Sequence, residues 1–436
     1  MKQNIRKISL VLGDIIFAYI ALFYTVYLGF WPNFSFNILQ QHLLPFSYLY
    51  LIWLILFYIF GLYDHNFTNP KENLFSRLGI CLSTCLAIGV IFFYTIPLFG
   101  ITPKTNLLIN IVIFGSLIMV WRQIFYWLFS SHFLKNIGFL GKNLWTDKII
   151  NEIKTHPQLG FRFVKFLSPS QSLFSQIKKE KISTLIIAQK LSRQKALVKE
   201  LYNCLALKID FLNLAAAYET IFQKIPVDFI DQEWFLNNLT EGEKIAYDKI
   251  KRLIDIFFAL LIIIITSPFW LIIALLIKRE DKGKVFYKQQ RSGRNNSVFW
   301  LYKFRTMGPD AEKQGPVWAK KNDERATKVG GILRKIHLDE LPQMLNVLKG
   351  DISLIGPRPE RPEFVQKLER QIPHYQLRHI IKPGFTGWAQ IKYRYARTPM
   401  DSQEKFQFDL YYLKNRSFLL DLGILLKTLQ ILFRGE

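Results

Sequence analysis

Four long apolar runs occupy the first third of the chain, and they constrain the fold more than any other feature. They cover residues 8–30, 43–62, 78–98 and 107–129. A helix needs about 20 predominantly apolar residues to cross the hydrocarbon core of a bilayer, and each run has that length. A buried core helix would explain one such run but hardly four in succession, so the sequence predicts a four-helix transmembrane bundle over residues 1–134.

The basic residues around these runs predict their orientation. Lys2, Arg6 and Lys7 precede the first run, and the connection of residues 31–42 contains no Lys or Arg. Because Lys and Arg are enriched in cytoplasmic connections, we expect both ends of the bundle in the cytoplasm. The first run could also be part of a secretory signal peptide, but no small-residue cleavage site follows it, so we expect it to be retained.

Cysteine and histidine usage excludes two other kinds of site. The chain has three cysteines, and Cys81 and Cys85 lie one helical turn apart inside the third apolar run. Small packing residues are the better interpretation there than metal ligands, and no disulfide framework is indicated. The seven histidines form no ligand cluster in the sequence.

Residues 135–242 change to short β-rich runs that alternate with amphipathic ones. Strands are predicted at residues 137–140, 161–167, 184–188 and 211–214, and helices at 146–156, 171–181 and 193–208. This alternation predicts a small Rossmann-like α/β domain with a parallel sheet. Gly138 and Gly141 lie at the end of the first strand, but Leu144 occupies the third glycine position of the dinucleotide fingerprint. We therefore expect a structural or regulatory domain rather than a cofactor site.

A fifth apolar run, residues 253–277, is long enough to cross a bilayer but has basic residues on both sides. Lys251 and Arg252 precede it and Lys278 and Arg279 follow it, which assigns both ends to the cytoplasm. Ser267 and Pro268 lie near its middle, where proline removes a helix hydrogen bond and neighbouring hydroxyls can satisfy the freed carbonyl. The pattern predicts a broken, re-entrant helix, and a straight fifth span is the alternative.

Asp255, in the first turn of this run, is expected to pair with Lys251 or Arg252 at helical spacing. The stretch that follows the run is densely basic and contributes to the net charge of +24. Anionic headgroups or a phosphorylated substrate would explain that charge, and nucleic acid is the weakest candidate because no recognised binding motif is present. Four of its residues would form a phosphate-binding wall if they converge: Arg291, Arg294, Lys303 and Arg305.

The most informative stretch for chemistry is residues 334–350, which contains the adjacent acids Asp339 and Glu340. Pro342 has no N–H and is tolerated only in a first turn, so a helix should begin within about one turn before it. This places both acids at the positive end of the helix, which favours an ionised carboxylate. Gly350 is a suitable residue for the C-terminal end. On these residues alone, two capping acids would be a sufficient explanation.

The surrounding blocks resemble the bacterial sugar transferase family, the polyprenyl-phosphate sugar-1-phosphate transferases. The similar blocks are the core Leu338-Asp-Glu-Leu-Pro-Gln343, Asp351-Ile-Ser-Leu-Ile-Gly-Pro-Arg-Pro359, Lys382-Pro-Gly-Phe-Thr-Gly-Trp-Ala-Gln390, Arg291-Ser-Gly-Arg294 and Lys303-Phe-Arg-Thr-Met307. The resemblance runs from about residue 249 to the C-terminus. His337 is a departure, since the family usually carries Ser or Thr there, and the hydroxyl that would complete a capping box with Glu340 is missing.

The resemblance implies a specific reaction for a catalytic domain at residues 243–436. Asp339 would attack the sugar-bearing phosphate of a UDP-sugar and expel UMP, and undecaprenyl phosphate would then take the phosphosugar from the enzyme. Glu340 would hold Mg²⁺, while Arg334 and Arg358 would grip phosphates. Such an enzyme would begin exopolysaccharide, capsule or O-antigen synthesis as a multi-pass protein of the bacterial inner membrane, with its active site facing the cytoplasm.

Two further segments and two alternatives complete the expectations. Gln390, in the turn-rich loop of residues 382–390, could contact the sugar or base, and residues 418–433 fit an interfacial helix. One alternative function is a non-catalytic membrane scaffold of a polysaccharide assembly machine, and the other is direct glycosyl transfer to the lipid with release of UDP. The sugar, the polymer and homodimer formation stay open at this point.

Overall fold

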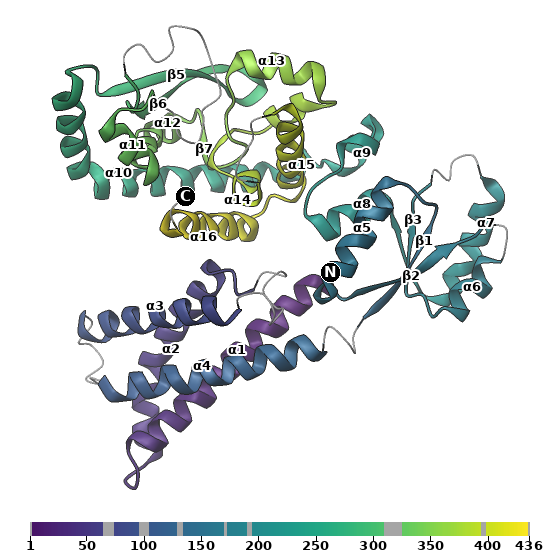
Figure 1. Cartoon of the computed structure of the whole chain (residues 1–436), viewed down its shortest axis with the longest axis horizontal. Helices are drawn as coiled ribbons and strands as arrows, with labels where there is room; N and C mark the ends of the chain where they lie inside the picture. Colours follow the sequence, from purple (N-terminus) through teal and green to yellow (C-terminus); the bar gives the residue numbers. More distant parts are fainter. Residues whose placement is uncertain are drawn as a thin grey trace. The chain divides into compact units, whose positions relative to one another are not determined.

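The computed structural model describes residues 2–63, 74–95, 104–128, 134–169, 172–189, 194–308, 325–393 and 398–434. The chain divides into two compact units, Met1–Ala217 and Tyr218–Glu436. The first unit holds a helical bundle and a sheet domain, and the second holds a mainly helical domain (Figure 1).

The four predicted apolar runs form long helices that pack as a bundle: α1 (Lys2–Gly29), α2 (Phe36–Ile59), α3 (Leu74–Thr95) and α4 (Lys104–Trp127). The ends of two predicted runs, residues 96–98 and 129, lie outside the described residues. The bundle core is aromatic, with Trp53 and Phe57 stacked on Phe114. Its outer surface is apolar too, and Ile8 and Leu28 are each 57% exposed. A helical bundle that is apolar on both its inner and its outer face is suited to a lipid environment.

Polar side chains inside the bundle pair with one another. Arg122 donates to Asp14 at 2.7 Å, and both side chains are buried. Asn110 donates to Thr25 at 3.1 Å and to the Tyr50 hydroxyl at 2.8 Å. Because an unpaired polar group in a bilayer costs several kcal/mol, these bonds fix how the helices pair.

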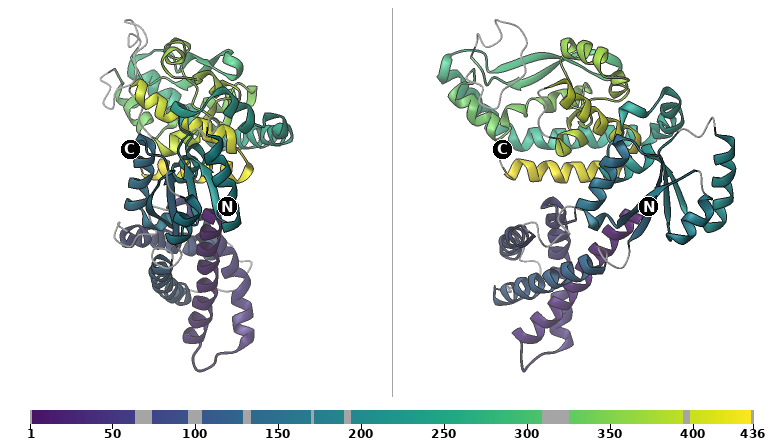
Figure 2. Two further views of the ribbon diagram at one scale, coloured as in Figure 1. Left: turned by 90° about the vertical axis from the view of Figure 1, so that its right-hand side faces the viewer. Right: turned by 45° about the vertical axis from the view of Figure 1, so that its right-hand side comes forward.

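The rest of the first unit is a four-stranded parallel sheet with the order β2-β1-β3-β4. Its elements are β1 (Lys135–Leu140), α5 (Leu144–Thr155), β2 (Phe161–Leu167), α6 (Leu173–Lys179), β3 (Thr184–Ile187), α7 (Lys195–Asn203), β4 (Asp210–Asn213) and α8 (Leu214–Phe222). Helices α6 and α7 lie together on one face of the sheet and α5 on the other (Figures 1 and 2). The predicted parallel-sheet α/β domain is confirmed.

The glycine turn of this domain ends in a closed cap. The Asn143 side chain accepts hydrogen bonds from the N–H groups of Trp145 and Thr146, at 3.0 and 2.9 Å. These are first-turn N–H groups of α5 that a bound phosphate would use. The protein's own side chain occupies them instead.

The second unit is mainly helical and contains two small sheets. Its helices are α9 (Gln232–Asn238), α10 (Ile245–Asp281), α11 (Lys328–Lys335), α12 (Gln343–Lys349), α13 (Pro362–Gln371), α14 (Trp388–Lys392), α15 (Pro399–Asn415) and α16 (Phe418–Arg434), with short 3₁₀ turns that include η8 (Arg294–Asn296), η9 (Leu338–Glu340) and η10 (Tyr375–His379). Strands β5 (Phe286–Ser292) and β6 (Val298–Phe304) pair antiparallel, and β7 (Ser353–Ile355) and β8 (Gly384–Thr386) pair parallel.

This unit begins at Tyr218, whereas the sequence placed the boundary at 242/243. Its first residues pack on the rest of the unit through three contacts: Trp388 donates to the Gln223 carbonyl at 3.0 Å, Ile225 N–H to the Gln407 carbonyl at 3.0 Å, and Lys414 to Glu219 at 2.7 Å. Composition could not reveal this boundary because the contacts join residues more than 160 positions apart.

Helix α10 contains the predicted proline break but remains helical across it. Pro268 lacks the N–H that would bond the Ile264 carbonyl, and the Ser267 hydroxyl donates to that carbonyl at 2.9 Å. Figure 1 shows that the ribbon of α10 changes direction along its length. Ile264 and Leu271 are more than 60% exposed, so the helix presents apolar surface on both sides of Pro268. Its path through a membrane stays a prediction.

By length and composition, five helices in the described part of the chain could cross a membrane. Four belong to the first unit, and the fifth contains α10. These helices indicate a multi-pass membrane protein.

The expected pairing of Asp255 is corrected. Asp255 accepts a hydrogen bond from the Leu354 N–H at 3.0 Å and so joins α10 to β7. Lys251 instead binds Asp421 of α16 at 2.6 Å, and Arg252 donates to the Leu348 carbonyl at the end of α12 at 2.7 Å. Each of these partners lies far along the chain, which helical spacing could not reveal.

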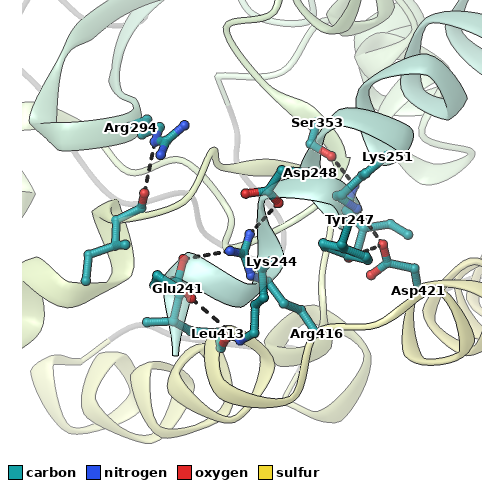
Figure 3. A network of polar contacts seen from close by, with 12 residues as sticks. Glu241, Lys244, Tyr247, Asp248, Lys251, Arg294, Ser353, Leu413, Arg416 and Asp421 are labelled. Atoms are coloured by element: carbon teal, nitrogen blue, oxygen red, sulfur yellow. Dashed lines mark hydrogen bonds and ion pairs between the residues drawn. The ribbon is translucent and has the colours of Figure 1, made fainter. Parts of the chain in front are cut away.

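A polar clasp joins the start of α10 to the connection between α15 and α16 (Figure 3). Arg416 is buried and donates to Asp248 at 2.7 Å and to Glu241 at 2.6 Å. Asp421 accepts from Lys251 and from the Tyr247 hydroxyl, each at 2.6 Å. The apolar helix is therefore anchored to the polar part of its unit by paired charges.

A buried amide joins α12 to β6. Asn346 is fully buried, accepts a hydrogen bond from the Tyr302 N–H at 3.0 Å, and donates to the Trp300 carbonyl at 2.7 Å and to Asp351 at 2.9 Å. These bonds fix the register between the helix and the strand.

We expect Asn346→Ala to destabilise the second unit by about 1–3 kcal/mol, because the Tyr302 N–H and the Trp300 carbonyl would lose their buried partner. Thermal unfolding of the detergent-solubilised chain should show a midpoint lowered by several degrees. Lys349→Ala, on the exposed side of α12, is the control and should change the midpoint little. Equal midpoints for the two variants would contradict the prediction.

A truncated chain that starts at Tyr218 should unfold at a higher temperature than one that starts at Glu243. The shorter chain loses the contacts of Glu219, Gln223 and Ile225 with α14 and α15. The measurement is thermal unfolding of both purified truncations in the same detergent. The prediction fails if removal of residues 218–242 leaves the midpoint unchanged.

Candidate active site

The two adjacent acids lie on η9, a 3₁₀ turn between α11 and α12. His337 precedes the turn in a left-handed conformation, with φ 58°, and its side chain makes no capping bond. The α-helix proper begins after Pro342, so Asp339 and Glu340 lie just before its first turn rather than inside it. Gly350 ends α12 with φ 92°, as predicted. Both acids are buried, with 6% of Asp339 and 8% of Glu340 exposed.

Lys303 of β6 lies between the two carboxylates. Its ammonium nitrogen is 2.6 Å from Glu340 Oε1 and 3.9 Å from Asp339 Oδ2. One cation thus serves both acids, and β6 brings it from 36 residues earlier in the chain. Lys303 therefore lies near Asp339, and a role in binding phosphate stays a prediction.

Glu340 is held by a second cation. Arg358 Nη2 donates to the same Oε1 atom at 2.7 Å. Burial alone would raise the pKa of Glu340, but Arg358 and Lys303 together hold it well below its usual value. Glu340 is therefore ionised throughout the physiological pH range.

The pKa of Asp339 is shifted in the opposite direction from that of Glu340. Burial raises its pKa and the neighbouring Glu340 adds to that rise, while Lys303, Arg334 and His337 oppose it. Its nearest cation among the described residues is Lys303, at a distance longer than a hydrogen bond. The sequence predicted that a helix terminus would favour the ionised form, whereas the burial of Asp339 disfavours it. A poorly solvated carboxylate is the more reactive of the two once it is ionised.

Two further arginines hold the Pro-Arg-Pro segment that carries Arg358. Arg291 donates to the Pro359 carbonyl and Arg378 to the Arg358 carbonyl, each at 2.9 Å. The Arg358 side chain is 43% exposed. Its guanidinium therefore has donors left for a ligand after it has bound Glu340.

The remaining predicted residues divide into those near the acids and those in the framework. Arg334 lowers the pKa of Asp339 while it donates to Thr306 at 2.8 Å. Arg294 donates to the Ile380 carbonyl at 3.1 Å (Figure 3), and Arg305 pairs with Asp281 at the end of α10. These last two contacts stabilise the fold, whereas Arg291 lies near enough to Arg358 and Glu340 for their charges to affect its pKa. Of the four basic residues, Lys303 is the one that pairs directly with the two acids.

Gln390 lines a small pocket together with Arg358, and its amide nitrogen donates to the Phe385 carbonyl at 3.2 Å. Sequence reasoning missed three residues of this neighbourhood: Arg378, Lys405 and Asp409. In the sequence these residues appear only as charges among apolar residues. A single sequence does not show whether such a charge is buried or exposed.

Asp339 and Glu340 could hold a Mg²⁺ ion if substrate phosphates and waters supply its other ligands. The described part of the chain contains no group of three His, Cys, Asp or Glu side chains that could hold a metal. Mg²⁺ needs only one or two carboxylates when substrate phosphates and waters complete its shell, and Asp339 and Glu340 supply two. Since two cations already bind Glu340 Oε1, a metal would have to use the other carboxylate oxygens.

Comparisons with known proteins show which family the chain resembles. Residues 246–435 match the family model described as bacterial sugar transferase. The chain is 41% identical over 235 residues to UDP-N-acetylgalactosamine-undecaprenyl-phosphate N-acetylgalactosaminephosphotransferase of Aeromonas hydrophila, a match that covers 54% of this chain and 55% of that protein. This chain thus spans about half the length of that relative.

Two other relatives match a part of the chain of similar length. The exopolysaccharide production protein PSS of Rhizobium leguminosarum bv. phaseoli is 40% identical over 185 residues, which is 41% of this chain and 92% of that protein. UDP-glucose:undecaprenyl-phosphate glucose-1-phosphate transferase of Escherichia coli (strain K12) is 40% identical over 188 residues, 43% of this chain and 40% of the relative. With nearly the whole of one relative matched at this identity, the chain belongs to the bacterial sugar transferase family.

Proposed function

We propose that this protein transfers a sugar-1-phosphate from a UDP-sugar to undecaprenyl phosphate and releases UMP. The observation that carries the proposal is the buried pair Asp339 and Glu340 with Lys303 between them and Arg358 beside them. The names of the relatives supply the substrate class, since they print undecaprenyl phosphate with UDP-glucose or UDP-N-acetylgalactosamine. The product would begin the synthesis of a surface polysaccharide.

The reaction proceeds in two displacements at one phosphorus atom. A carboxylate oxygen of Asp339 attacks the phosphorus that bears the sugar, and the bond from that phosphorus to the UMP oxygen breaks. An oxygen of the lipid phosphate then attacks the same phosphorus and breaks its bond to Asp339. The product is a lipid diphosphate sugar, and the bond between the sugar and its phosphate oxygen is never broken.

The other residues control charge during these steps. Lys303 and Arg358 offset the negative charge that approaches a carboxylate nucleophile. Glu340, ionised at all relevant pH values, would hold Mg²⁺ through its free oxygen together with the substrate diphosphate. A bound Mg²⁺ would supply Lewis-acid stabilisation of the phosphate oxygens.

The proposal includes a place in the cell. The site lies in the same unit as α10, whose ends carry basic residues and whose middle contains Pro268. A helix that enters and leaves one leaflet would keep the site on the cytoplasmic side of the bacterial inner membrane, where UDP-sugars are made. A lipid acceptor would then reach the site from the same leaflet.

The first test follows the covalent intermediate. The enzyme is incubated without lipid acceptor with a UDP-sugar labelled in the sugar, and protein-bound label and UMP are measured. The wild type should give stoichiometric label and UMP, whereas Asp339→Asn should give neither because the amide cannot form the acyl phosphate. Label retained on Asp339→Asn, or UDP released by the wild type, would refute the assignment.

The second test addresses Glu340. Glu340→Gln replaces a carboxylate ligand with a neutral, poorer one, so turnover should fall on the order of 100-fold and more Mg²⁺ should be required. Binding of Mn²⁺ as a spectroscopic substitute, measured with UMP present, should weaken in parallel. If Glu340→Gln leaves the Mn²⁺ affinity unchanged, Glu340 is not a metal ligand, and only its electrostatic role remains.

The third test addresses the topology of α10. Single cysteines are placed at Lys249 and Arg279, which are exposed at its two ends, in a chain with the native cysteines replaced. An impermeant thiol reagent added outside intact cells should label neither site, and both should react after the membrane is opened. Labelling of one site alone from outside would show a straight span.

A further inference from the structure

A small pocket beside Arg358 is not used by the two displacements described above. It lies between the Pro-Arg-Pro segment, η10, α14 and α15, and its lining includes Arg358, Arg378, Gln390, Lys405 and Asp409. Its volume is about 20 Å³, which admits one or two water-sized groups. Only the edge of a larger ligand could enter it.

The pocket contains a cation without a partner. Within the part of the chain that the structure describes, Lys405 has no ion pair and no hydrogen bond, although it is largely shielded from solvent. The two acids of the pocket wall have other partners, since Asp409 lies 3.0 Å from Arg378 and Glu360 lies 3.7 Å from Arg291. Burial lowers the pKa of Lys405, and the charges of Arg358 and Arg378 add to that effect, while the charges of Glu360 and Asp409 oppose it. An anionic ligand would relieve this repulsion.

The pocket also contains an acceptor without a donor. Gln390 Oε1 is buried and has no hydrogen-bond partner in the described residues, while its Nε2 is bonded to the Phe385 carbonyl. A buried acceptor left unpaired costs about 1–3 kcal/mol. A ligand that brings a hydroxyl or N–H group would satisfy it.

We infer that Lys405 is a substrate-binding residue, and that this pocket takes an anionic phosphate oxygen of the UDP-sugar together with a neighbouring hydroxyl or N–H group that donates to Gln390. The inference rests on the proposed function. The UDP-sugar carries hydroxyls close to its diphosphate, whereas a prenyl phosphate has an apolar carbon chain next to its phosphate. The unpaired ammonium group and the unpaired hydrogen-bond acceptor together therefore favour the UDP-sugar over the lipid phosphate as the ligand of this pocket.

The pocket is rigidly tied to the acid pair. Arg378, held by Asp409, donates to the Arg358 carbonyl at 2.9 Å, and Arg358 donates to Glu340 at 2.7 Å. A phosphate bound between Arg358 and Lys405 would therefore have a defined position relative to Glu340. Lys405 would orient the diphosphate without touching the nucleophile.

The test compares Lys405→Met with Lys405→Arg and with the control Lys367→Met, which removes a charge from the exposed face of α13. All are full-length chains in nanodiscs. The KM for UDP-sugar in adduct formation should rise about 10- to 100-fold in Lys405→Met, the loss expected for one charge-assisted hydrogen bond. The amount of adduct at saturating donor and the KM for undecaprenyl phosphate should stay the same, and Lys405→Arg should recover part of the donor KM. Lys367→Met should match the wild type.

The outcomes separate the sources of the phosphate. A raised KM for undecaprenyl phosphate with an unchanged donor KM would assign the pocket to the lipid and overturn the inference. Unchanged values for both substrates would also overturn it. If the wild type forms no adduct, the proposed function fails instead, and equilibrium binding of the UDP-sugar still decides the role of Lys405.

A measurement on the wild type covers the case in which Lys405→Met does not fold. An amine-acylating reagent is applied to the intact chain, and modification of Lys405 and Lys367 is followed by mass spectrometry. Saturating UDP-sugar should protect Lys405 at least about 10-fold and should not protect Lys367, as expected when a ligand buries an amine. Equal modification of Lys405 with and without UDP-sugar would contradict the inference.

Discussion

The candidate site depends on the ion pairs of Lys303, because its ammonium group lies between two buried carboxylates that are adjacent in the chain. Two such acids cannot both be charged in a shielded place without a compensating cation. The compensation is unequal. Glu340 has two cations and a lowered pKa, while Asp339 is left with a distant one and a raised pKa. One acid is thereby suited to a permanent charge and the other to attack on an electrophile.

The position of Lys303 depends in turn on the buried contacts behind it. Asn346 ties α12 to β6 at Trp300 and at Tyr302, the residue before Lys303, and Arg252 binds the carbonyls at the end of α12. Arg291 binds the Pro359 carbonyl and Arg378 binds the Arg358 carbonyl. Arginines at such a site do not all bind substrate, and here several of them build the frame that holds Arg358 in place.

The second unit combines a polar site with an apolar helix. The clasp around Arg416 and Asp421 joins α10 to α15 and α16 through paired charges, so the helix cannot shift independently of the domain that contains the acids. This arrangement suits a reaction between a water-soluble nucleotide sugar and a lipid phosphate. The apolar helix and the charged site are then parts of one rigid domain.

The sequence by itself determined the long apolar helices, the parallel α/β sheet, the family and the acid pair, because each depends on local patterns: runs of apolar residues, alternation, and short contiguous motifs. It also predicted that Ser267 would stand in for the hydrogen bond that Pro268 removes, since both residues are neighbours in the chain. Only the tertiary structure decided which basic residues reach the acids. Arg291, Arg294 and Arg305 have the same charge as Lys303 in the sequence, yet each is bonded to a carbonyl or acid of the framework. The partners of Asp255, the start of the second unit at Tyr218 and the unpaired Lys405 likewise depend on contacts between distant segments. The charge of a residue can be read from the sequence, whereas the group with which it pairs depends on the fold.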